Sequence, residues 1–159
     1  MQKNLKNSKN NFCPCGSLKI YAQCCEIFIS RKKLPETPEQ LMRSRYTAFT
    51  KADADYMQFS MKEGALGEEF NPEEVRAWAL SVKWQELKIF KAYLDQDNLN
   101  KGYVLFSAMY KQAGKKFEMK ELSEFVKQEN GQWLYTGPAE SPEHAHAGHC
   151  GDSSCSKIH

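Results

Sequence analysis

The 159-residue sequence has no cysteine between residues 26 and 149 and no histidine before residue 144. It also lacks any apolar run near the roughly 20 residues that span a bilayer, and no apolar stretch of the secretory kind follows its amino-terminal lysines. The 22 Lys and Arg residues nearly balance the 20 Asp and Glu residues. These absences argue against a membrane protein, a secreted disulfide framework and a chain that works mainly as a polycation on nucleic acid.

We therefore expect a cytoplasmic protein whose thiols stay reduced, so that clustered cysteines indicate a metal or redox site rather than disulfides. Because the central region has no histidine, it lacks the usual general base of neutral-pH chemistry. The sequence therefore favours a protein that is not an enzyme. Asp53, Asp55 and Glu121 could act as acids or bases. Each of these residues also has a structural explanation. The two aspartates can cap helices, and Glu121 can lie on the surface of a strand.

Hydrophobic residues make up 41% of the chain and aromatic residues 12%, which is enough to form a packed core. Composition shifts divide the sequence into four segments. We expect a flexible basic arm over residues 1–11, a small cysteine module over 12–30, a folded domain over 31–137 and a flexible Cys/His-rich tail over 138–159.

Three segments of the central region carry helix signals. Thr37-Pro38-Glu39-Gln40 has an N-cap residue, a proline in the first turn and a glutamine that closes a capping box, so a helix is expected from Pro38. Asp53 or Asp55 can cap a short second helix. Asn71-Pro72 starts a third, whose apolar residues recur with helical spacing.

From residue 84 onward the apolar period changes to two, which is typical of strands. Strands are expected over 84–94, 103–111, 117–127 and 132–136. Turn residues separate them, and Asn130-Gly131 is the strongest hairpin signal. Helices followed by antiparallel strands predict an α+β fold, in which a curved sheet covers a helical layer.

The first four of the six cysteines form a metal-ligand pattern. Cys13-Pro14-Cys15 is followed by Cys24-Cys25, with eight residues between the two pairs. Four thiolates at this spacing can reach one tetrahedral ion, with Zn–S distances of about 2.3 Å. A closed four-sulfur site is structural, because a catalytic zinc keeps an open position. We therefore predict that Cys13, Cys15, Cys24 and Cys25 bind Zn²⁺.

The neighbouring residues suit such a site. Pro14 stiffens the loop and Gly16 lets the backbone fold tightly round the ion. Ser17 is expected to cap a helical turn that returns Cys24-Cys25 to the metal, and Lys19 could offset the negative charge of four thiolates on one dication. The alternatives to a zinc site are disulfides, a C-x-C redox relay and an iron–sulfur site. A disulfide between the vicinal Cys24 and Cys25 would be strained.

At these residues the sequence resembles a known family. The run CPCGS followed by CC resembles the SEC-C motif, a small zinc-binding module, and residues 38–56 are similar to a signature of the YchJ-like (UPF0225) family of bacterial proteins. Similar positions also lie in the expected strands: Trp84, residues 105–110 and residues 125–135. The resemblance covers about residues 12–137. It implies an NTF2-like cone of three helices packed on a curved antiparallel sheet, preceded by a zinc module. It implies no particular activity.

Many members of that family end in a second SEC-C motif, which this sequence lacks. Its tail instead holds a Cys/His-rich segment, from which a second, Cys₂His₂ metal site could form. The candidate ligands of that site are His149, Cys150, Cys155 and His159. The alternative is a disordered tail whose side chains bind metals weakly.

An NTF2-like cone often encloses a pocket between its sheet and its helices. The side chains expected to line it are Tyr46, Tyr56, Trp84, Phe106, Tyr110 and Phe125. These aromatic residues could instead fill the core. Arg43 and Arg45 belong to the family-like signature. One is expected to face solvent, and the other to pin the zinc module to the cone or to bind an anion or acidic partner.

The sequence is compatible with three functions. The first is a protein-interaction or adaptor protein that uses a structural Cys₄ zinc module to contact another protein. The second is a small-ligand-binding or enzymatic domain with a pocket in the cone, which rests on fold analogy. The third is nucleic-acid binding through the zinc module and the basic arm, which the balanced charge makes less favoured.

Overall fold

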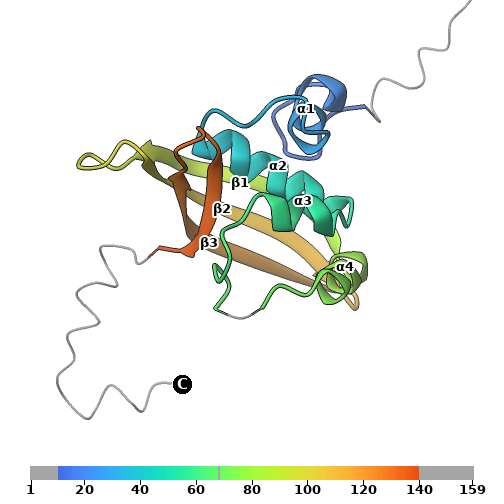
Figure 1. Cartoon of the computed structure of the whole chain (residues 1–159). Helices are drawn as coiled ribbons and strands as arrows, with labels where there is room; N and C mark the ends of the chain where they lie inside the picture. The colour runs from blue at the N-terminus through green and yellow to red at the C-terminus, as the bar shows by residue number, and fades with distance from the viewer. Residues whose placement is uncertain (1–10, 68, 140–159) are drawn as a thin grey trace, which may run out of the picture.

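The computed structural model of the chain describes residues 11–67 and 69–139. A small amino-terminal unit and three helices pack against a four-stranded antiparallel sheet (Figure 1). The helical elements are η2 (Tyr21–Gln23), α1 (Cys25–Ile29), α2 (Pro38–Thr50), α3 (Ala54–Phe59) and α4 (Pro72–Ser81). The strands are β1 (Lys83–Leu94), β2 (Lys101–Gln112), β3 (Lys115–Lys127) and β4 (Trp133–Pro138).

The helices of the cone begin at side-chain caps, as the sequence predicts. Thr37 caps α2, Asp53 caps α3 and Asn71 caps α4, and each accepts hydrogen bonds of 3.0–3.3 Å from backbone N–H groups of the first turn. The Gln40 side chain also acts at the start of α2. Its Oε1 accepts from the N–H of Glu36, one residue before the cap, at 2.8 Å. These caps set where each helix begins and so how it reaches the sheet.

Replacing Asn71 by alanine is expected to lower the free energy of unfolding by about 1 kcal/mol, because two backbone N–H groups of α4 lose their acceptor. Urea denaturation of the purified chain measures this change. Asn71→Asp is the control, since a carboxylate also caps helices well and favours the positive end of the helix dipole. Equal losses in both variants would contradict the capping role.

The sheet is an antiparallel meander in the order β1-β2-β3-β4. Register shifts interrupt β1 between Trp84 and Glu86 and between Ile89 and Lys91, and another lies where β3 pairs with β4. Such bulges bend and twist a sheet. The bent sheet wraps around α2 and α3, which cross its concave face in Figure 1, while α4 lies at one end.

The hairpin connections fall at the turn residues of the sequence, but the tight two-residue turn is not the Asn130-Gly131 pair. The tight two-residue turn is Ala113-Gly114, between β2 and β3, where both residues have positive φ, +50° and +77°. This is the type I′ pattern that fits the twist of strands. The Asn130-Gly131 pair does join β3 to β4, but in a longer connection in which Gln128 N–H donates to the Gln132 carbonyl.

Strand β4 closes the cone by pairing with the segment after α3. Tyr135 N–H donates to the Ser60 carbonyl at 2.9 Å, and Lys62 N–H donates to the Tyr135 carbonyl at 2.8 Å. The core between the layers contains fully buried side chains from both, including Leu41 of α2, Val104 of β2 and Phe125 of β3. The α+β cone expected from the sequence is confirmed. Among the described residues, no helix is long and apolar enough to cross a membrane.

Candidate metal centre and cone cavity

Four cysteine side chains of the amino-terminal unit converge on one point. Their Sγ atoms all lie within 4.8 Å of one another, with Cys15 and Cys24 3.6 Å apart and Cys24 and Cys25 4.0 Å apart. Cys13, Cys15 and Cys25 are buried, Cys24 is half-buried, and none of the four forms a disulfide. Such a group of sulfurs could hold a metal ion.

A tight loop positions the first two sulfurs. Cys13 N–H donates to the Lys19 carbonyl at 2.8 Å, and Gly16 N–H donates to the Cys13 carbonyl at 3.3 Å. Gly16 has φ +78°, in the left-handed region that glycine adopts without strain. The short helices η2 and α1 then return the chain so that Cys24 and Cys25 meet the loop.

Ser17 has a different role from the cap that the sequence suggests. The residue before η2 is Ile20, and no side chain caps that turn. The Ser17 hydroxyl instead lies 3.1 Å from Cys24 Sγ and accepts from Lys19 N–H at 3.2 Å. A hydroxyl that donates to a sulfur stabilises its thiolate form.

Helix α2 joins the cysteine cluster to the cone. Arg43 donates from Nη1 to the Cys15 carbonyl at 2.7 Å, and the Thr47 hydroxyl lies 3.6 Å from Cys13 Sγ. The three buried cysteines also belong to the same apolar cluster as Leu41 and Tyr46 of this helix. The cysteine unit therefore packs on the cone instead of hanging from a linker.

The thiols ionise unequally when no cation is present. Hydrogen bonds with the Cys13 and Cys25 thiols hold the pKa of Cys15 far below its ordinary value. The pKa of Cys25 is raised by hydrogen bonds with Cys13 and Cys15 and by burial, and burial raises the pKa of Cys24. Cys15 is therefore more easily ionised than Cys24 and Cys25, and a bound dication would favour the thiolate form of every ligand.

The two signature arginines both point inward. Arg43 reaches the cysteine loop, while its Nε lies 3.4 Å from a Glu39 carboxylate oxygen. Arg45 is 5% exposed, donates from Nη1 to the Met57 carbonyl at 2.9 Å and to Ser60 Oγ at 2.7 Å, and lies over the Tyr135 ring. Arg43 thus makes the contact between module and cone, and Arg45 ties α2 to α3 and β4. The expectation that one of the two faces solvent is wrong, because Arg43 is half-buried and Arg45 is buried.

A cavity of about 210 Å³ lies inside the cone, between the helices and the sheet. Tyr46, Trp84 and Phe106 line it, as the sequence suggests. The other three expected lining residues do not. Tyr56 is buried in α3 with its hydroxyl 2.7 Å from Ser44 Oγ, Tyr110 stacks on Phe117 at the end of the sheet, and Phe125 packs against Tyr135.

Glu121 is the polar cavity residue whose environment the sequence analysis missed. It lines the cavity with Ser123, rather than lying on the outer surface of β3. The signal was available in the period of two, because residue 121 is in phase with Met119 and Ser123, the inward set. The charges at 118, 120 and 124 obscured that phase. Asp53, the other acid considered, has the expected capping role.

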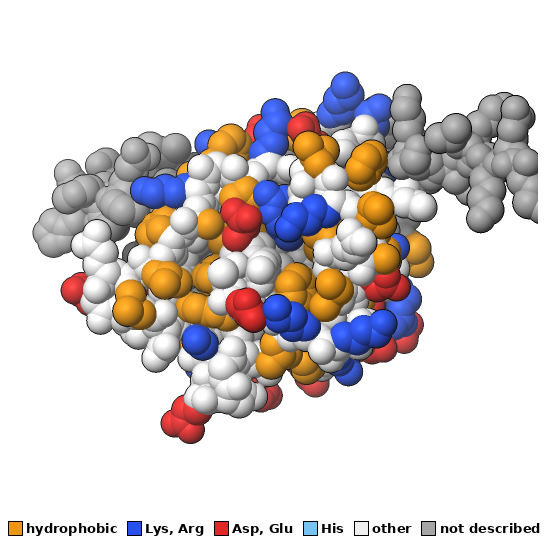
Figure 2. All heavy atoms as spheres, turned by 90° about the horizontal axis from the view of Figure 1, so that it is seen from above, with side chains coloured by type: hydrophobic (Ala, Val, Ile, Leu, Met, Phe, Trp, Pro, Cys, Tyr) orange, Lys and Arg blue, Asp and Glu red, His pale blue; other side chains and the backbone are white. Residues whose placement is uncertain are grey.

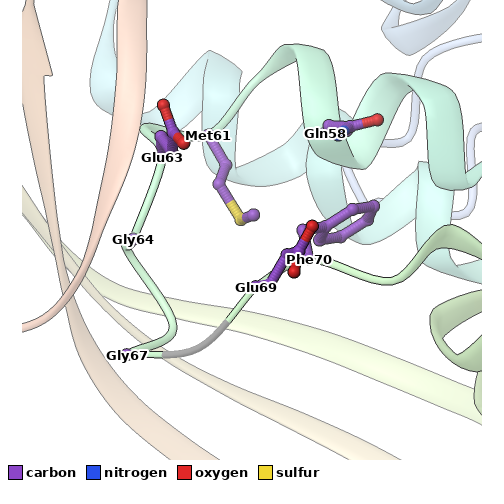
Figure 3. Close-up of a pocket in the computed structure, with 7 residues that line it drawn as sticks. All are labelled: Gln58, Met61, Glu63, Gly64, Gly67, Glu69 and Phe70. Carbon is purple, nitrogen blue, oxygen red and sulfur yellow. The ribbon is translucent and has the colours of Figure 1, made fainter.

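A larger space, the outer hollow, opens between α3 and the loop that follows it (Figure 3). Its volume is about 680 Å³. Its lining residues are Gln58, Met61, Glu63, Gly64, Gly67, Glu69 and Phe70. Met61 and Phe70 line both the outer hollow and the cavity, so they form part of the wall between the two. In Figure 3 the Met61 side chain extends from the end of α3 into this space.

The second candidate metal site lies outside the described residues. His149, Cys150, Cys155 and His159 all fall after residue 139, where the structure describes nothing. A second metal at the tail stays a prediction.

The fold and the site define an NTF2-like α+β protein with a compact cysteine module at its amino end. A model of the family described as "YchJ, middle NTF2-like domain" matches residues 37–138. A UPF0225 protein of Sodalis glossinidius is 40% identical over 126 residues, 77% of this chain and 79% of that one. A UPF0225 protein of Vibrio vulnificus is 41% identical over 134 residues, 82% and 78% of the two chains. The chain belongs to the YchJ-like (UPF0225) family.

Two solved structures share the architecture. A SEC-C motif containing protein from Rhodopseudomonas palustris, solved in solution, has 29% sequence identity and a TM-score of 0.72, over 82% of this chain and 98% of that one. A crystal structure of a SEC-C motif containing protein from Psychrobacter arcticus has 23% identity and a TM-score of 0.69, over 83% and 84% of the two chains. At 23% identity, the similarity to the Psychrobacter arcticus protein shows a shared fold and nothing more.

Proposed function

We propose that this protein is a zinc-binding interaction protein, in which a closed Cys₄ site holds a small protein-contacting module on an NTF2-like scaffold. The observation that carries the metal assignment is the convergence of four sulfurs within 4.8 Å. A tetrahedral Zn²⁺ with Zn–S distances of about 2.3 Å places its sulfurs about 3.8 Å apart. The Cys15–Cys24 and Cys24–Cys25 sulfur separations, 3.6 and 4.0 Å, lie on either side of that value.

The donor set fits a structural ion. Zn²⁺ held by four cysteines has no open position for a substrate, and it would cross-link the loop to α1. The Ser17 and Thr47 hydroxyls face two of the sulfurs and could donate to the thiolates. A cytoplasmic location suits this site, since thiols stay reduced there.

The tip of the module supports a role in protein contact. Leu18 is 81% exposed at φ +66°, a left-handed conformation that costs a leucine roughly 1–2 kcal/mol. Phe12 and Ile20 form a backbone bridge beneath it, and both are also exposed. These three residues form what we call the apolar tip. A strained loop that holds apolar side chains in water is suited to insertion into a partner.

The charge beside the tip indicates the chemistry of the partner. A groove of about 410 Å³ runs along the module and α2, and Lys19, Lys33, Arg43 and Glu39 line it. Arg43 pairs with Glu39 and Lys33 with Glu36, which leaves Lys19 as the basic side chain of the groove that forms no ion pair among the described residues. Figure 2, a view from above, shows basic and apolar side chains interspersed over the face in view. A protein segment with apolar side chains next to acidic residues would complement such a surface.

Leu18→Ser is expected to weaken capture of a protein partner about tenfold or more while leaving the fold and the zinc content unchanged, because it removes an apolar contact and nothing buried. The measurement is affinity capture with the zinc-loaded chain, followed by binding titration of the protein recovered. Leu99→Ser is the matched control, since Leu99 is 68% exposed in the turn after β1, away from the module.

A partner bound equally by the wild-type chain and Leu18→Ser would contradict the role of the tip. Binding that is lost after nuclease treatment and falls steeply with salt would instead support the nucleic-acid function.

A further inference from the structure

The cone cavity combines an apolar lining with two polar groups that have unused hydrogen-bonding capacity. Its walls are formed by aromatic rings and by the methionines of α2, α3, β3 and the segment after α3. Those four methionines are Met42, Met57, Met61 and Met119. Thioethers adapt to irregular shapes and pack well against rings. The lining is suited to a flat apolar guest.

Trp84 provides the first polar group. Its Nε1 is buried and has no hydrogen-bond partner among the described residues. The indole is held by four neighbouring rings at centroid distances of 5.5–5.7 Å. Its neighbours are Tyr46, Phe49, Trp78 and Tyr110. Buried donors are nearly always satisfied, so this unpaired one indicates a missing acceptor. Its nitrogen has almost no accessible surface, so an acceptor in the cavity reaches it only when one of the surrounding rings shifts.

Glu121 provides the second polar group of the cavity. Its Oε1 accepts from Ser123 Oγ at 2.6 Å and from Tyr135 Oη at 2.8 Å. Burial raises the pKa of Tyr135, so its hydroxyl stays protonated and donates. Both bonds go to one oxygen, and within residues 11–67 and 69–139 no hydrogen bond to Oε2 is found. The carboxylate is therefore fixed in place with one oxygen ready to accept from a guest.

The charges of the cavity balance. Arg45 also lines it, and although burial lowers its pKa to about 10, the guanidinium stays protonated at neutral pH. One cation and one carboxylate leave no net charge on the wall, so neither an anionic nor a cationic guest is favoured.

We propose that the cone cavity binds a small uncharged aromatic molecule, which accepts a hydrogen bond from Trp84 and donates one to Glu121. The size fits, because an apolar cavity of about 150 Å³ holds benzene, and this one measures about 210 Å³. Water is a poorer occupant. The lining is mostly apolar and offers water few hydrogen bonds to the protein.

The cavity meets solvent beside Leu66 and Trp78, which line it and are 47% and 37% exposed. Such a molecule could enter there without movement of the buried Met61.

The test uses three one-ring probes and the zinc-loaded full chain, followed through the tryptophan indole N–H signals. Benzamide is neutral and carries both a carbonyl and N–H donors, toluene has the ring alone, and benzoate adds a charge. Benzamide is expected to shift the Trp84 signal in a saturable way and to bind more tightly than toluene or benzoate. The Trp133 signal is the internal reference, because its Nε1 already donates to the Glu36 carbonyl.

Two variants locate the site. Trp84→Phe, followed through the indole signal of Trp78, which also lines the cavity, should weaken benzamide binding about tenfold, the effect of one hydrogen bond, and leave toluene binding nearly unchanged. Ala108→Leu adds bulk to a buried residue of the cavity wall and should abolish binding of all three probes. Should that variant fail to fold, Ala108→Val adds less volume and should still weaken all three.

The proposal is overturned if benzamide moves no indole signal at millimolar concentration, if benzoate binds best, or if binding survives both Trp84→Phe and the Ala108 variant. The last result would place the probe elsewhere on the protein.

Discussion

Cys15→Ser is expected to reduce the bound Zn²⁺ from about one ion per chain to less than roughly a tenth after dialysis against a weak chelator. Cys15 is fully buried at the centre of the cluster, and a serine hydroxyl is a poor replacement for a thiolate ligand. Metal analysis of the purified chain measures the loss. The proposed zinc site is wrong if the variant keeps its full metal content.

The same substitution should also destabilise the cone. Cys13, Cys15 and Cys25 share one apolar cluster with Leu41 and Tyr46 of α2, so loss of the ion loosens a wall of the main core. We expect the melting temperature to fall by about 10 °C or more, which for a chain of this size corresponds to several kcal/mol. Cys150→Ser combined with Cys155→Ser is the control, and it should leave the melting temperature unchanged.

Arg45→Ala is expected to lower the free energy of unfolding by about 3 kcal/mol, because a large buried side chain and its charged hydrogen bonds are lost. The Arg45 guanidinium bonds the Met57 carbonyl and Ser60 Oγ, and it covers the Tyr135 ring. Removing it leaves a gap where α2, α3 and β4 meet. Guanidinium chloride denaturation near pH 7 gives the value.

Arg76→Ala is the matched control for that experiment. Arg76 pairs with Glu73 on the surface of α4, with side chains 40% and 85% exposed, and an exposed pair contributes at most about 1 kcal/mol. The two arginine variants should therefore differ severalfold in their cost. Similar small losses would mean that Arg45 is not a structural tie between the layers.

Local signals in the sequence were sufficient for most of the fold. The caps at Thr37, Asp53 and Asn71 begin helices where their side chains can accept from first-turn N–H groups. The period of two likewise marks all four strands. Both patterns follow from bonds within a few residues, which is why a single sequence can show them.

The errors arise where contacts between distant residues decide the outcome. The Ser17 hydroxyl faces Cys24 Sγ instead of capping a helix, because η2 and α1 return the chain to the loop. Tyr56 and Phe125 are aromatic residues of the layers that bound the cavity, yet they pack behind its walls. Only the packed structure shows whether such a ring faces the cavity or lies behind its wall.

Sequence spacing predicted the cysteine grouping, and the arginine pair suggested its attachment to the cone without showing which atoms make it. Cys13 and Thr47 lie 34 residues apart, and Arg43 reaches the Cys15 backbone across 28 residues. Such long-range contacts depend on how α2 crosses the sheet. The signature stretch that contains Arg43 gave a reason to suspect a contact, and the structure supplies the atom that it binds.

Zinc K-edge X-ray absorption tests the central claim most directly. The sample is the Cys150→Ser and Cys155→Ser double variant loaded with one equivalent of Zn²⁺, so that the only cysteines left are the four of the module. Four sulfur neighbours at about 2.3 Å and no nitrogen or oxygen neighbour are the predicted result. A shell of mixed sulfur and nitrogen or oxygen ligands would contradict a closed Cys₄ site.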